Sequence, residues 1–76
     1  MVTVHREAGF RIVIRTNDHP PPHVHVQHAD GEAKIELDPV RVVEVYGLSK
    51  SQVRTAMDMV KAKAFVLLTE WRQIHG

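Results

Sequence analysis

Three consecutive prolines, Pro20 to Pro22, constrain the fold of this chain more than any other feature. Each proline holds φ at about −65° and lacks a backbone N–H, so this segment must be an extended loop and not a helix. The residues that follow, His23-Val24-His25-Val26, alternate with the period of a strand, which places His23 and His25 on one face. A rigid loop that leads two imidazoles onto one strand face predicts a site there.

The composition bounds what kind of protein this is. The 76 residues are enough for one domain, residues 1–76, and too few for a second core. Without cysteine the chain has neither disulfides nor thiolate metal ligands. No apolar run reaches the roughly 18 residues of a membrane span, and the N-terminus lacks a signal-peptide pattern. We therefore expect a cytoplasmic protein without membrane contact. A net charge of +1 leaves nucleic acid open as a partner but does not indicate it.

Alternating apolar residues predict a small antiparallel β-meander of three to four strands over residues 1–46. The predicted strands are 9–16, 23–28, 32–37 and 40–46, and residues 2–5 suit a further short strand. Asp30-Gly31 is a hairpin signal between two of them, and Asp38-Pro39 marks the next turn.

One long C-terminal helix is predicted over residues 49–75. Ser49 is a preferred N-cap, and Gln52 stands three residues later, which is the capping-box spacing. Neither glycine nor proline interrupts residues 50–75, and apolar residues recur there at three- and four-residue steps. The predicted fold class is therefore α+β, a meander packed by this single helix.

The predicted hairpin places carboxylates opposite the histidines. A two-residue loop at Asp30-Gly31 pairs His23 with Asp38 and His25 with Glu36 on the outer face, and apolar residues with each other on the inner face. Two imidazoles and two carboxylates are a donor set for one divalent metal, Zn, Ni or Mn. The candidate metal ligands are His23, His25, Glu36 and Asp38.

Two other interpretations of the same surface stay open. In the first, a carboxylate opposite an imidazole prepares it for acid–base catalysis, with His19, His23 and His25 as the candidate catalytic residues. Asp18 lies at the start of the proline loop and would complete either site, while Arg11 and Arg15 would suit a phosphate. In the second, the pairs are ordinary cross-strand contacts on an exposed or partner-binding face.

The C-terminal helix predicts a protein interface. A straight helix of 26 residues is about 39 Å long, whereas four strands span about 19 Å, so the helix should extend beyond its sheet. Its distal part is apolar around much of its circumference, which indicates burial on more than one side. The candidate interface residues are Phe65, Val66, Leu68 and Trp71, and the partner is either a cognate small protein or a second copy of the chain.

The segments His-Pro-Pro-Pro-His-Val-His-Val (19–26) and Gly-Glu-Ala-Lys (31–34) resemble the bacterial domain of unknown function 4160 family. The resemblance runs from Gly9 to Gly76, with Asp18 standing where that family commonly has Glu. Its hallmarks here are Asn17, His19, Pro21, Pro22, His23, His25, Gly31, Glu32, Ala33, Lys34 and Pro39. The resemblance implies a component of a toxin–antitoxin-like regulatory module that acts through protein–protein binding, with the histidine-rich sheet face as its functional surface. The alternative is a toxin enzyme that cleaves a phosphodiester with His23 and His25.

Overall fold

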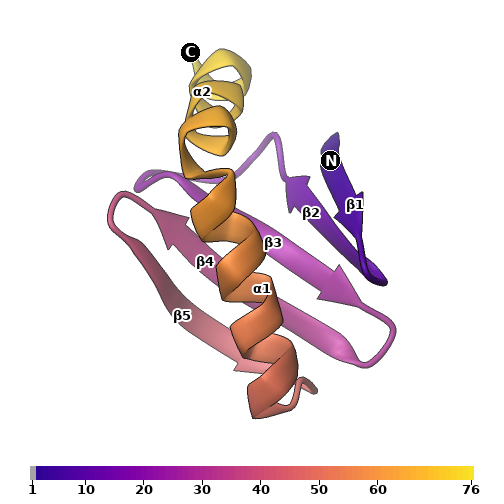
Figure 1. Ribbon diagram of the computed structural model, residues 1–76. Coiled ribbons are helices and arrows are strands. Elements are labelled where there is room, and N and C mark those ends of the chain that lie inside the picture. Colours follow the sequence, from indigo (N-terminus) through magenta and orange to yellow (C-terminus); the bar gives the residue numbers. More distant parts are fainter. Residues whose placement is uncertain (1) are drawn as a thin grey trace.

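Five antiparallel strands and two helices make up the computed structural model, which describes residues 2–76 (Figure 1). The strands are β1 (Val2–Glu7), β2 (Phe10–Ile14), β3 (His23–His28), β4 (Gly31–Leu37) and β5 (Val40–Tyr46). They lie in sequence order across one sheet, so the fold is α+β with a meander, as predicted. Helix α1 (Lys50–Ala62) crosses one face of the sheet. Helix α2 (Ala64–His75) follows it and extends past the end of the sheet.

The prediction of three to four strands was wrong because β1 is a complete strand. It pairs with β2 from Val2 opposite Ile14 to Glu7 opposite Phe10. The two strands join through Ala8 and Gly9, which have φ of 52° and 80°. Tight hairpins need such positive φ values, but alanine rarely adopts them, so the sequence carries only a weak turn signal here.

The β3–β4 hairpin turns one residue earlier than predicted. His28 pairs with Gly31, so the turn is Ala29-Asp30, and the whole register shifts by two residues. A two-residue shift keeps every side chain on its predicted face, but it changes the partners. Gly31 serves a close backbone approach: a Cβ there would collide with the carbonyl oxygen of Tyr46. The prediction placed Gly31 in the turn. In the structure, a glycine is required at this position because the end of β5 passes so close to it.

The prediction of one long helix was also wrong, although its start is confirmed. The hydroxyl of Ser49 accepts a hydrogen bond from the backbone N–H of Gln52 (3.2 Å), whose side chain accepts one from the N–H of Ser49 (2.7 Å). The helix ends at Ala62, because Lys63 has φ −119° and ψ 13°. This break allows Leu67 and Trp71 of α2 to be buried in the core, with 2% and 6% of their surfaces exposed. Tertiary burial thus bends the chain where no glycine or proline does.

The core lies between the helices and the inner face of the sheet. Its main members are Phe10, Ile12, Ile14, Val24, Val26, Ile35, Leu37, Ala56, Met59, Val60, Leu67 and Trp71. Each large apolar side chain buried here contributes about 1.5–3 kcal/mol to folding. Among residues 2–76, no helix is both long enough and apolar enough to cross a membrane. Since apolar side chains fill the inner face of the sheet, a polar functional site is expected on the outer face.

Candidate metal centre

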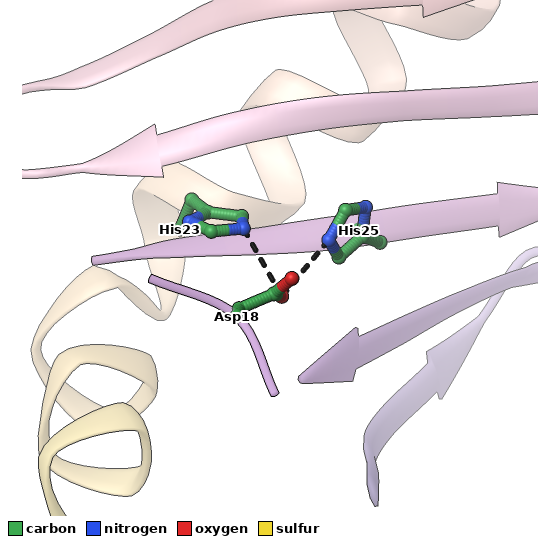
Figure 2. A group of neighbouring side chains, drawn as sticks. All are labelled: Asp18, His23 and His25. Atoms are coloured by element: carbon green, nitrogen blue, oxygen red, sulfur yellow. Dashed lines mark hydrogen bonds and ion pairs between the residues drawn. The ribbon is translucent and has the colours of Figure 1, made fainter. Parts of the chain in front are cut away.

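His23 and His25 lie on the outer face of the sheet, yet both are buried, with 4% and 5% of their surfaces exposed. The loop between β2 and β3 covers them and brings Asp18 over the start of β3 (Figure 2). Two backbone hydrogen bonds hold this loop: Asp18 N–H donates to Arg15 O (3.2 Å), and Leu37 N–H donates to Pro22 O (3.0 Å). The prolines between these anchors limit the conformations that the loop can adopt.

One carboxylate oxygen meets both imidazoles. Asp18 Oδ2 lies 3.0 Å from His23 Nε2 and 3.0 Å from His25 Nε2, as the dashed lines in Figure 2 show. One donor atom from each of the three residues lies within 4.8 Å of the other two. The centroids of the His23 and His25 rings are 5.1 Å apart, and the ring planes are nearly perpendicular, at 78°. The Nε2 edges of both rings point to the same carboxylate.

The contact made by Nδ1, the ring nitrogen of His23 that does not face Asp18, indicates which nitrogen carries the proton. His23 Nδ1 lies 2.9 Å from the carbonyl oxygen of Pro21, which can only accept a hydrogen bond. The proton of a neutral His23 is therefore on Nδ1, and its Nε2 presents a lone pair to the Asp18 carboxylate. Two acceptors at 3.0 Å repel each other unless a cation or an additional proton lies between them.

His25 also has an oxygen acceptor beside each ring nitrogen, but the contact of its Nδ1 is longer than that of His23. Its Nδ1 lies 3.4 Å from Glu32 Oε2 and is a buried nitrogen without a hydrogen bond among the described residues. Its Nε2 lies within hydrogen-bond distance of Asp18 Oδ2 (3.0 Å), so without a metal this nitrogen can donate its proton there, and a bound ion would take the place of that proton. Glu32 is held in place by Arg15 Nη2 (3.2 Å) and by Gln27 Nε2 (3.0 Å). Histidine ligands of metals commonly have a carboxylate or carbonyl acceptor on the far nitrogen, as both rings do here.

Asp18 is ionised near neutral pH. Burial raises the pKa of Asp18, but the hydrogen bond with His25 and nearby positive groups outweigh it. The net result is a pKa below its ordinary value of 3.8, to which the charges of His23, His25 and Arg15 contribute. The cluster therefore offers one anionic oxygen and two imidazole nitrogens.

The structure does not bring the other predicted site residues to this cluster. Glu36 is opposite His23 on β4, but its Oε1 accepts a hydrogen bond from Arg41 Nε at 2.7 Å. Asp38 is exposed in the β4–β5 turn, since the two-residue register shift moves it away from His23. His19 is exposed on the loop. Of the predicted metal ligands, the structure groups His23 with His25, and the carboxylate beside them is that of Asp18. The sequence signal for Asp18 was its position beside the proline run.

The predicted interface residues divide into two groups. Phe65 and Val66 are exposed, at 82% and 58% of their surfaces. Leu68 is half-buried against the core, and Trp71 lies within it.

The donor set suits a divalent transition metal. Two imidazole nitrogens and a carboxylate oxygen are found on zinc and on other first-row metals. Two ligand atoms that bind one tetrahedral zinc ion at about 2.0–2.1 Å lie about 3.3 Å apart. The two 3.0 Å separations at Asp18 are a few tenths of an ångström shorter than this spacing, and all three donor atoms lie within 4.8 Å of one another.

The fold and the cluster together define a class: a small α+β domain with a histidine–carboxylate cluster on the outer face of a meander. The chain belongs to the family described as Domain of unknown function (DUF4160), whose profile matches residues 9–72. The match includes β2 to β5, the proline loop and all three members of the cluster. No curated protein and no solved structure matches the chain. Function must therefore be argued from the site itself.

Proposed function

We propose that this protein is a divalent-metal-binding domain in which Asp18, His23 and His25 hold one ion. The observation that carries the proposal is the direction of the two rings. Each histidine has its Nδ1 beside an oxygen acceptor and its Nε2 at 3.0 Å from the same carboxylate oxygen. Two imidazole ligands favour zinc or nickel over manganese, which prefers oxygen ligands.

The bound ion would tie the β2–β3 loop to the sheet. Both rings are at most 5% exposed, so substrate would have little access to their nitrogens. This burial supports an ion that stabilises a conformation better than it supports the alternative, a toxin enzyme that cleaves phosphodiesters with His23 and His25. A domain of 76 residues has a small core, and metal binding adds directly to its folding free energy.

The wider role that we propose is regulation through protein–protein binding, as one component of a toxin–antitoxin-like module. Support comes from α2, where Phe65 and Val66 are exposed next to each other while Leu67 and Trp71 lie in the core. Exposed apolar side chains on a helix anchored in this way suit a partner surface. The partner would be a cognate small protein or a second copy of the chain.

Zinc titration of the metal-free chain tests the proposal. Isothermal titration calorimetry and elemental analysis should find one zinc per chain, with a Kd of about 1 μM or tighter. Asp18→Asn, His23→Ala and His25→Ala should each weaken binding at least about tenfold. His5→Ala is the matched control, because His5 is a half-buried histidine in β1 that contacts Glu7 and not the cluster. Equal loss of zinc in the His5 variant, or no stoichiometric binding, would contradict the proposal.

A further inference from the structure

Two arginines face each other at the β1–β2 edge of the outer face. Arg6 and Arg11 are direct partners in the antiparallel pair, so their side chains project from the same face. Like charges in this position repel. Among residues 2–76 neither guanidinium is in an ion pair with a carboxylate. Arg11 is instead held by a neutral group, since its Nε (3.1 Å) and its Nη2 both donate to Gln27 Oε1.

A cavity of about 650 Å³ opens beside this arginine pair. Its volume falls within the range of about 300–1,000 Å³ that is usual for small-ligand sites. Glu7 contributes a carboxylate to its lining, but Glu7 Oε1 is already 2.8 Å from His5 Nε2. With two guanidinium groups and one carboxylate, the lining of the cavity keeps a net positive charge.

His28 adds a neutral donor to the same cavity. The backbone N–H of Asp30 donates to His28 Nδ1 at 3.1 Å, which makes Nδ1 an acceptor and places the proton of the neutral ring on Nε2. A Cβ built on Gly9 would lie at an ordinary contact distance of 3.5 Å from that Nε2, so the β1–β2 turn lies directly beside this donor. The ring is supported by Phe10, whose centroid is 4.7 Å away, and both residues line the cavity.

We infer that this cavity binds a small phosphate-bearing ligand, with the phosphate between Arg6 and Arg11 on the outer face and the Nε2–H of His28 available to another part of the ligand. Guanidinium groups suit phosphate because they present parallel N–H donors to its oxygens. A bound dianion would also remove the repulsion between the facing arginines. This inference does not depend on metal at Asp18, His23 and His25.

The test is an NMR titration of the full chain with inorganic phosphate and with a nucleoside monophosphate, each with and without zinc. Amide shifts should cluster at residues 6–11 and 27–29, with a Kd of about 1 mM or tighter for at least one probe. Tighter binding of the nucleotide would support a ligand whose remainder also contacts the cavity lining, whereas equal binding would support recognition of phosphate alone. Response to single-stranded RNA without response to either small probe would overturn the inference.

Two variants that each remove one positive charge distinguish binding at a specific site from general electrostatic attraction of phosphate to the protein. Arg6→Gln should weaken phosphate binding at least tenfold, and it should raise the Tm in phosphate-free buffer because the repulsion is removed. Arg54→Gln removes the same charge from an exposed position on α1 and should leave the affinity unchanged. Equal weakening in both variants, or a lower Tm for Arg6→Gln, would overturn the inference.

Discussion

His75 Nε2 lies 3.1 Å from the carbonyl oxygen of Arg15, which ties the last turn of α2 to the start of the loop that carries Asp18. The other ring nitrogen of His75 is 2.9 Å from the carbonyl oxygen of Trp71, and its ring stacks on Trp71 at 4.0 Å. Carbonyl oxygens only accept, so both contacts are hydrogen bonds only when the imidazole carries two protons.

Replacement of His75 should loosen α2. His75→Ala removes the bond to Arg15 and leaves a carbonyl group unpaired, so we expect the free energy of unfolding to fall by about 1–3 kcal/mol. Urea denaturation followed by circular dichroism measures this change. Gln73→Ala, at an exposed position on the same helix, should stay within about 0.5 kcal/mol of the parent, and an equal loss there would argue against a specific contact.

Zinc should stabilise the folded chain. At a free concentration of about 100 times its Kd, an ion that binds only the folded state adds about 2.7 kcal/mol, and the Tm should rise accordingly. A chelator should reverse the shift, and Asp18→Asn should abolish it. Magnesium should have little effect because it prefers all-oxygen ligand sets. A zinc-induced rise of the same size in Asp18→Asn would place the ion elsewhere.

Asp18 predicts sensitivity of the metal-free chain to acid. Its folded-state pKa lies below the ordinary value of 3.8, so the carboxylate stabilises the fold above that value and loses this contribution as the pH falls through the folded-state pKa. The free energy of unfolding of the parent should therefore decline below about pH 4 more steeply than that of Asp18→Asn. Parallel declines in a pH series of denaturation curves would show that Asp18 does not carry this dependence.

The β1–β2 turn should accept a stabilising substitution. Ala8 has φ 52°, a left-handed conformation that costs a residue with a Cβ about 1–2 kcal/mol. Ala8→Gly should raise the free energy of unfolding by several tenths to about 1 kcal/mol in thermal or urea denaturation. Ala29→Gly, in the β3–β4 turn where no positive φ occurs among the described residues, is the control and should give no gain.

Neighbouring residues of α2 should respond in opposite ways to substitution. Leu67→Ala should cost about 2–5 kcal/mol because Leu67 is 2% exposed, whereas Phe65→Ala should cost less than about 0.5 kcal/mol at 82% exposure. If the exposed pair forms an interface, Phe65→Asp should abolish association, as measured by light scattering of the chain alone or with its partner, without loss of fold. Association that survives this change would move the interface elsewhere.

Several features of the fold follow from local sequence. Alternation in 23–28 and 32–37 correctly predicted which side chains face the core, because a strand repeats every two residues whatever its partner. Ser49 and Gln52 correctly predicted the start of α1, because a capping box is closed by residues three apart. The proline run identified the histidine segment, since its restricted backbone is a property of the residues themselves.

Other features depend on contacts between residues far apart in the chain. The break at Lys63 follows from burial of Leu67 and Trp71, and the two-residue register shift accompanies the close approach of Gly31 to Tyr46. The carboxylate at the candidate metal centre is Asp18 because the β2–β3 loop folds back over β3. The sequence by itself determined the faces, the cap and the histidine pair, since these depend on neighbours along the chain. Register, the helix break and the third member of the cluster required the tertiary structure, because they depend on which distant surfaces pack together.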